Sequence, residues 1–204
     1  MQNDTFDYSN IQYMALTPSN MINLGTVAPD FNLPDTVSKK NLSLHDIKGE
    51  KVTVIMFICN HCPYVIHVMP EIVRITGKYR SKGVVFIAIG SNDTEKYPQD
   101  GPEKMKEFMA EWKLDIPYLF DESQAVAKAY DAACTPDFYI FSEDKKLKYR
   151  GRLDESRPRV EHPQPLTGKD LRGALNAILA NQLVSEIQFP SMGCNIKWKE
   201  DVIY

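Results

Sequence analysis

The stretch that decides the fold is an apolar run followed directly by two cysteines, Val52-Thr53-Val54-Ile55-Met56-Phe57-Ile58-Cys59-Asn60-His61-Cys62. Residues 52–58 are apolar at nearly every position, which is typical of a central strand buried on both faces. The residues after Cys62 carry apolar side chains at helical spacing, namely Val65, Val68, Ile72 and Ile75. We therefore expect the two cysteines where a buried strand gives way to a helix, which Pro70 should kink or interrupt.

Two cysteines separated by two residues can close a small disulfide ring and open it again. At a strand-to-helix junction this spacing is typical of a redox-active pair. A helix N-terminus offers a partial positive charge and free N–H groups, so we expect it to lower the pKa of Cys59. His61 can add a donor or a positive charge near the Cys59 sulfur. We therefore predict a more oxidising couple than a pair spaced by Gly-Pro would give.

Two other interpretations of the pair stay open. The cysteines could form half of a zinc site that Cys134 and Cys194 complete, although neither of these belongs to a second C-x-x-C. Alternatively, they could be two structural thiols, since free cysteine often serves as a small buried hydrophobe. We predict redox chemistry with no bound cofactor and no metal.

Composition narrows the classes of protein. The chain has 204 residues, 43% hydrophobic and 25% charged, as expected for one globular domain with a full core. The net charge of -3 argues against a nucleic-acid partner. The first twenty residues contain no apolar region of a secretory signal, and no apolar stretch approaches the roughly 20 residues that cross a bilayer. We therefore expect a cytoplasmic protein without membrane contact, in a reducing compartment where cysteine pairs tend to be catalytic.

Further elements alternate along the chain. We predict strands over 84–89 and 118–120, helices over 101–113, 123–130 and 167–181, and hairpins over 25–44 and 138–151. Strands that alternate with helices indicate an α/β layer structure. The expected division is an N-terminal arm over 1–23, a domain over 24–182 and a C-terminal tail over 183–204.

Several segments together resemble one family. Gly25-x-x-Ala28-Pro29-Asp30-Phe31-x-Leu33 is similar to the opening of the AhpC/TSA family, which groups alkyl hydroperoxide reductases, thiol-specific antioxidants and membrane-anchored thioredoxin-like reductases. Cys59 and Cys62 resemble the thioredoxin active site, and Thr135-Pro136 resembles the Thr–cis-Pro of that fold. A peroxiredoxin-like subgroup is indicated by three further segments: residues 59–65, 154–158 and 193–198.

The resemblance implies a thioredoxin-like fold with a central mixed β-sheet flanked by helices, an N-terminal β-hairpin extension and a C-terminal tail. It also implies a thiol–disulfide oxidoreductase in which Cys59 attacks a substrate disulfide and Cys62 resolves the mixed disulfide. Asn60, Thr135 and Pro136 would then contact the substrate, a disulfide-bearing protein or a small thiol compound. A thioredoxin- or glutathione-type thiol would be the electron donor.

Departures from the family pattern keep two alternatives open. Peroxiredoxins carry a proline seven residues and a threonine three residues before the attacking cysteine, where this chain has Val52 and Met56. Thioredoxin carries a buried acid at the position of Thr53. A thiol-dependent peroxidase (an antioxidant) with Cys59 as peroxidatic cysteine is one alternative, and a non-catalytic binding module is the other. Cys134, beside Thr135, and Cys194, in the tail, are candidate accessory thiols.

Overall fold

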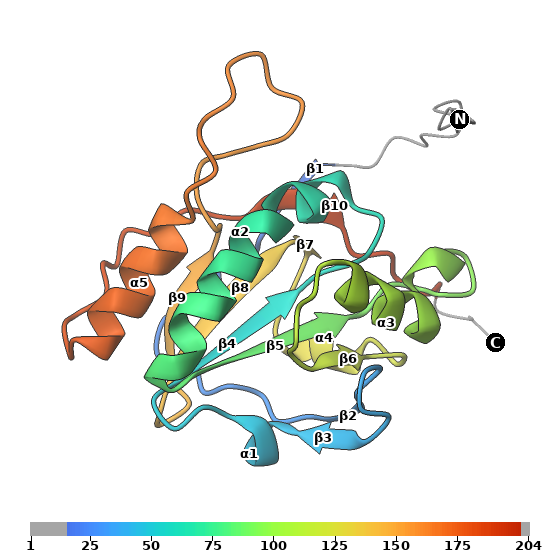
Figure 1. Cartoon of the computed structure of the whole chain (residues 1–204), viewed down its shortest axis with the longest axis horizontal. Coiled ribbons are helices and arrows are strands. Elements are labelled where there is room, and N and C mark those ends of the chain that lie inside the picture. Colours follow the sequence, from blue (N-terminus) through green and yellow to red (C-terminus); the bar gives the residue numbers. More distant parts are fainter. Residues whose placement is uncertain (1–15, 201–204) are drawn as a thin grey trace.

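A five-stranded mixed sheet forms the centre of the computed structural model, which describes residues 16–200 (Figure 1). The strands lie in the order β6 (Tyr118–Phe120), β5 (Val84–Gly90), β4 (Val52–Phe57), β8 (Asp137–Ser142) and β9 (Leu147–Gly151). β4, β5 and β6 run parallel to one another, whereas β8 is antiparallel to both of its neighbours. The predicted central mixed sheet is confirmed, and its middle strand is the apolar run before the cysteines.

Helices cover both faces of this sheet, which explains why β4 is apolar at consecutive positions. The helices are α1 (Leu44–Ile47), α2 (Pro63–Tyr79), α3 (Pro102–Glu111), α4 (Ala125–Ala129) and α5 (Lys169–Leu179). Val54 and Met56 of β4 belong to the core beneath α2, α3 and α5. Ile55 and Phe57 belong to the core on the opposite face, which α4 and α1 cover. Among residues 16–200, no helix is both long and apolar enough to cross a membrane.

Helix α2 departs from the sequence-based expectation at one point. Pro70 lies inside it, yet the helix runs without interruption from Pro63 to Tyr79. Proline removes one backbone hydrogen bond from a helix, but tertiary packing can offset that loss. Val65, Val68, Met69 and Ile72, which flank Pro70, are all buried in the core. The predicted interruption is therefore wrong.

Two smaller sheets complete the fold. β2 (Asn32–Pro34) and β3 (Asn41–Ser43) form the predicted N-terminal hairpin. β10 (Met192–Asn195) lies between β1 (Leu16–Pro18) and β7 (Cys134–Thr135), antiparallel to both. The tail predicted from the sequence thus adds a strand beside Thr135, and the described end of the N-terminal arm adds another. Residues 1–15 of that arm lie outside the described part of the chain.

Candidate active site

The sequence-predicted residues Cys59, Cys62 and Thr135 come together at one end of the sheet. Cys59 follows the end of β4, and Cys62 is the N-cap of α2, with Pro63 in the first turn. The Cys59 sulfur lies 3.3 Å from the Thr135 hydroxyl, and the Cys62 thiol, when protonated, donates to the Thr135 carbonyl at 3.3 Å. The Thr135–Pro136 peptide bond is cis, as the sequence predicted. One residue of β7 therefore contacts both cysteines.

A third sulfur joins this pair. Cys194 of β10 lies opposite Thr135 in the strand register, and its sulfur is 2.6 Å from that of Cys62. Cys59, Cys62 and Cys194 are all buried, with 2%, 0% and 3% of their surfaces exposed. The Cys134 sulfur lies 3.9 Å from the Pro136 carbonyl, and burial raises its pKa. Of the two candidate accessory thiols, Cys194 contacts the pair.

Asp100 is the site residue that sequence reasoning missed. It ends a short 3-10 helix, Pro98–Asp100, and only 4% of its surface is exposed. Its carboxylate accepts hydrogen bonds from the Asn60 backbone N–H and the Asn92 side-chain amide, both at 2.8 Å. The position at which thioredoxin carries its buried acid holds Thr53, whose hydroxyl accepts a bond from the Gly49 N–H instead. A buried acid therefore reaches the cysteines from a different part of the chain.

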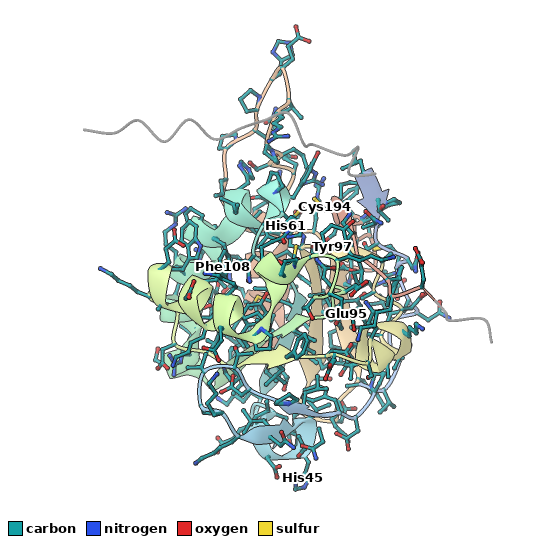
Figure 2. The ribbon with its side chains drawn as sticks, turned by 90° about the vertical axis from the view of Figure 1, so that its right-hand side faces the viewer. His45, His61, Glu95, Tyr97, Phe108 and Cys194 are labelled. Carbon is teal, nitrogen blue, oxygen red and sulfur yellow. The ribbon has the colours of Figure 1, made fainter. Side chains whose placement is uncertain are left out.

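His61 completes the polar side of the site. Its Nδ1 lies 2.7 Å from an oxygen of Asp100, within ion-pair distance but without the alignment of a hydrogen bond. Its ring stacks on Tyr97 at 5.9 Å with an interplanar angle of 4°. Figure 2 shows His61, Tyr97 and Cys194 at one end of the molecule, with His45 at the other. His61 thus sits between an acid and an aromatic ring beside the dithiol.

The predicted substrate-binding groups are already engaged within the molecule. The Asn60 side chain donates to the Gln99 carbonyl at 2.9 Å and accepts from the Tyr118 hydroxyl at 3.2 Å. The backbone of Thr135, which we expected to pair with an extended substrate peptide, is instead paired with β10. Contact of Thr135 with substrate is not tested by this pairing and stays a prediction. Contact of Asn60 and Pro136 with substrate stays a prediction.

The electrostatics of the reduced site differ from the sequence-based expectation. The hydrogen bond to Cys62 raises the pKa of Cys59, and burial and the Asp100 charge act in the same direction. Burial opposes ionisation of Cys62, but hydrogen bonds from the Cys194 and Cys59 thiols and the Val65 N–H outweigh it and lower the pKa. The expected lowering of the Cys59 pKa is wrong here, because α2 begins after Cys62 and its N-terminal N–H groups serve that sulfur.

Two further groups add to the chemistry of this end. Cys59, His61 and Asp100 each offer one ligand atom, and these atoms lie within 4.8 Å of one another. A sulfur, nitrogen and oxygen set of this kind suits zinc, and it differs from the four-cysteine site weighed from the sequence. Asp137, next to Pro136, is fully buried, and burial raises its pKa to about 7.

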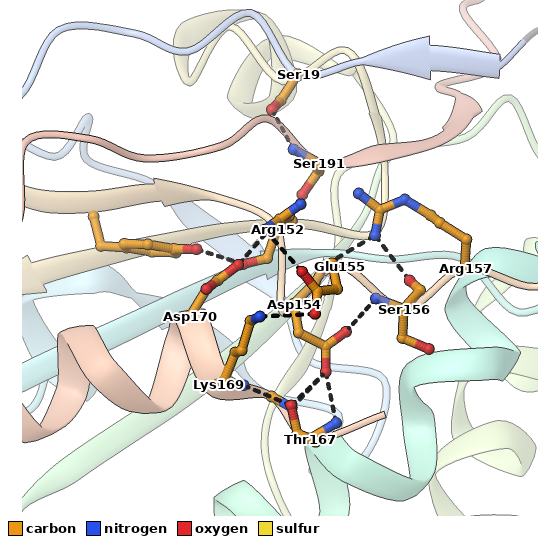
Figure 3. Close-up of polar contacts among 12 residues, drawn as sticks. Ser19, Arg152, Asp154, Glu155, Ser156, Arg157, Thr167, Lys169, Asp170 and Ser191 are labelled. Atoms are coloured by element: carbon orange, nitrogen blue, oxygen red, sulfur yellow. Dashed lines mark hydrogen bonds and ion pairs between the residues drawn. The ribbon is translucent and has the colours of Figure 1, made fainter. Parts of the chain in front are cut away.

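Ion pairs and backbone hydrogen bonds both hold the loop after β9, where Arg152 pairs with Asp170 at 2.6 Å and Lys169 with Glu155 at 2.7 Å (Figure 3). Asp154 is 1% exposed and accepts hydrogen bonds from the backbone N–H groups of Ser156, Thr167 and Gly168. Arg157 donates to the carbonyls of Asp154 and Ser156. This loop borders a shallow pocket beside the cis-proline, whose lining includes Tyr64, Pro136, Arg157 and Met192. Asp154 is therefore a buried carboxylate that organises this loop.

A central mixed sheet with a dithiol at the start of α2, facing a cis-proline, defines a protein of the thioredoxin-fold class. Comparison with known families agrees: residues 23–164 match the Redoxin family, and the chain belongs to it. The thiol-disulfide oxidoreductase ResA of Bacillus thuringiensis is 25% identical over 145 residues, which cover 71% of this chain and 79% of that protein.

Two solved structures resemble this one over nearly their whole length. An uncharacterized conserved protein from Geobacillus kaustophilus is 53% identical, with a TM-score of 0.90, and the match covers 93% of this chain and 99% of that one. A putative thiol:disulfide interchange protein DsbE from Chlorobium tepidum is 20% identical with a TM-score of 0.59, covering 78% and 99%. The second likeness supports the fold, and the predicted thioredoxin-like architecture is confirmed.

Proposed function

We propose that this protein is a thiol–disulfide oxidoreductase that acts through Cys59 and Cys62. The observation that carries the proposal is the contact of both sulfurs with a single residue, Thr135, at the start of a helix. The similarity to relatives named as thiol-disulfide oxidoreductases supports the same activity. The substrate is a disulfide-bearing protein or a small disulfide. A thioredoxin- or glutathione-type thiol in the cytoplasm supplies the electrons.

Of the three neighbouring thiols, Cys62 is the one whose pKa is lowered by hydrogen bonds, against the effect of its burial, whereas the pKa values of Cys59 and Cys194 are raised. Transfer of the Cys59 proton to Cys62, along the hydrogen bond between them, gives the Cys59 thiolate. This thiolate attacks one sulfur of the substrate disulfide, and the other substrate sulfur leaves as a thiolate. Cys62 then gives its proton to the substrate thiolate that has left and attacks the Cys59 sulfur, so that the second substrate sulfur leaves as a thiolate and the Cys59–Cys62 disulfide forms.

Burial sets a condition on this reaction. Because Cys59 is 2% exposed, a protein disulfide reaches it only when part of the covering structure moves aside. The cover includes β10 on one side and the segment with Tyr97 and Asp100 on the other. The pocket lined by Tyr64 and Pro136 lies next to this cover and is the approach that we assign to the substrate.

Reduction of insulin disulfides with dithiothreitol as electron donor tests the proposal. Wild type should accelerate insulin precipitation, and Cys59→Ser should reduce the rate to that of dithiothreitol alone. Cys134→Ser is the matched control, since it removes a buried thiol whose sulfur contacts the Pro136 carbonyl rather than the pair. Equal rates for wild type and Cys59→Ser would contradict the proposed activity.

The peroxidase alternative is separated by a second measurement. Met56, at the position of the peroxiredoxin threonine, is fully buried and carries no hydroxyl to bind a peroxide. We therefore expect stopped-flow consumption of hydrogen peroxide by Cys59 to be no faster than that by free cysteine. A rate several orders of magnitude higher would replace the oxidoreductase with a peroxidase.

A further inference from the structure

Cys194 is held against the dithiol by an ordered strand. On one side of β10, Leu16 of β1 pairs with Cys194, and Ser19 and Ser191 exchange backbone and side-chain hydrogen bonds at 3.0 and 2.9 Å. On the other side, the Ile196 N–H donates to the Ala133 carbonyl at 3.0 Å. The segment that carries Cys194 is thus fixed both before and after the cysteine, and its sulfur has a defined position.

A glycine permits this close approach. A Cβ atom at Gly193 would overlap the carbonyl oxygen of Thr135 and crowd Pro136. Any other residue would therefore push β10 away from the cis-proline and move Cys194 away from Cys62. The backbone brings the third sulfur as near to Cys62 as strand pairing allows.

We propose that Cys194 is a third redox-active thiol, which exchanges the disulfide with Cys62 and releases Cys59. This rests on the proposed function, because it begins from the Cys59–Cys62 disulfide formed in the oxidoreductase reaction. The Cys194 thiolate attacks the Cys62 sulfur, a Cys62–Cys194 bond forms, and the Cys59–Cys62 bond breaks. Cys59 leaves as a thiolate and takes up a proton equivalent to the one that Cys194 lost. The exchange consumes neither an oxidant nor a reductant.

The oxidised state favours this attack. In the reduced protein, the hydrogen bond to the Cys62 anion is the largest cause that raises the pKa of Cys194, while the charge of Lys197 acts to lower it. When Cys62 enters a disulfide, its negative charge is gone. Cys194 then ionises more readily, at the same time as its target, the Cys62 sulfur, becomes electrophilic.

The exchange gives the protein two oxidised forms that share Cys62. In one form Cys59 and Cys62 are both blocked, and in the other the disulfide lies between α2 and β10 while Cys59 is a free thiol. Cys59 can then return to the substrate side as a thiol even though the protein remains oxidised. A conventional two-cysteine site has no such form.

Tryptic mapping under non-reducing conditions distinguishes the two disulfides, because trypsin separates the Cys59–Cys62 pair from Cys134 and from Cys194. Cys59 and Cys62 share the peptide 52–74, Cys194 lies in 173–197, and Cys134 lies in 129–145. Wild-type protein is oxidised with diamide, alkylated at acidic pH to trap free thiols, digested and analysed by mass spectrometry. We expect both an internally bridged 52–74 peptide and a 52–74 peptide linked to 173–197.

Cysteine-to-serine variants test which sulfurs form the link between the two peptides. Cys59→Ser should shift the intramolecular product almost completely to the 52–74/173–197 link, Cys194→Ser should abolish that link, and Cys134→Ser should leave its yield unchanged. Absence of the link from oxidised wild type, or a link from 52–74 to 129–145 in its place, would overturn the proposal and leave Cys194 as a packed thiol. Because the mapping does not require turnover, it stays decisive even where insulin reduction fails.

Discussion

The two cysteines of the dithiol lie a few ångströms apart, yet their surroundings differ. The Cys59 side is polar and acidic: Asp100, His61 and Tyr97 come from a loop before α3 and from the motif itself. The Cys62 side is made of sulfur and backbone, with Cys194 at 2.6 Å and the N-terminal N–H groups of α2. The negative charge of the reduced site goes to the side that can donate hydrogen bonds to it, and not to the side that already holds a carboxylate.

The comparison shows that the first cysteine of such a motif need not be the stabilised anion. The surroundings instead lower the pKa of Cys62 and raise that of Cys59. In the proposed reaction the proton of Cys59 passes to Cys62 before the mixed disulfide forms, and the low pKa of Cys62 favours its release again for the resolving attack. The asymmetry therefore favours rapid release of the substrate over rapid capture.

The largest loss of stability is expected when the backbone of β10, which carries Cys194 to Cys62, is displaced. Gly193→Ala places a methyl group against the Thr135 carbonyl, so β10 must separate from β7. We expect the free energy of unfolding to fall by more than ~3 kcal/mol and Cys194 to become open to alkylation. Gly77→Ala, in α2 where a Cβ meets open space, is the matched control and should be neutral or stabilising. Equal behaviour of the two variants in urea unfolding would mean that β10 is not held as described.

Asp137, beside the cis-proline, should make the free energy of unfolding depend on pH. Burial raises its pKa to about 7, above the usual 3.8 of an aspartate, so the folded protein retains a proton that the unfolded chain loses. This contribution to stability is complete below about pH 4 and is lost as the pH rises through about 7. Asp137→Asn removes this slope, on the order of 3 kcal/mol between pH 4 and 8. Urea unfolding under reducing conditions, with the exposed Asp115→Asn as control, measures it; an unchanged slope would contradict the raised pKa.

The Cys59 side is tested by removing its acid. Asp100→Asn keeps an acceptor for the Asn60 N–H but removes the charge that disfavours the Cys59 thiolate. We expect Cys59 to be alkylated about tenfold faster at pH 7, as measured by mass spectrometry of the 52–74 peptide. Asp93→Asn, a neighbouring buried acid whose carboxylate accepts the Glu95 N–H, should have no such effect. A slower reaction in Asp100→Asn would show that the acid assists ionisation rather than opposing it.

What could be predicted from the sequence was local. The buried strand β4, the helix after Cys62 and the proline at 136 follow from apolar periodicity and motif spacing, and the structure has them as expected. Asp100 and Cys194 join the site through long-range contacts of a short 3-10 helix and a four-residue strand. Such short segments have no periodicity to read, and pairing of distant strands depends on the whole fold.

The difference between local patterns and long-range contacts also explains the predictions that were wrong. Helix α2 begins after Cys62, as expected, but the hydrogen bonds at its first turn lower the pKa of Cys62 rather than that of Cys59. Nothing in the residues after 183 predicts the strand that pairs with Thr135. Only the close approach at Gly193 shows why one forms there.

The smallest effect is expected for the histidine of the motif. Since the Nδ1 of His61 lies 2.7 Å from Asp100, His61→Gln removes an imidazole that can pair with the acid beside Cys59. Because a partly exposed ion pair contributes about 0.2–1 kcal/mol, Cys59 alkylation at pH 6 should slow by about two- to fivefold. The redox potential measured by glutathione equilibration should shift downward, as it should in His61→Pro. His45→Gln, an exposed histidine at the opposite end of the molecule, is the control (Figure 2). A faster reaction or a higher potential in His61→Gln would show that His61 does not support the Cys59 thiolate, and the polar side of the site would then act through Asp100 alone.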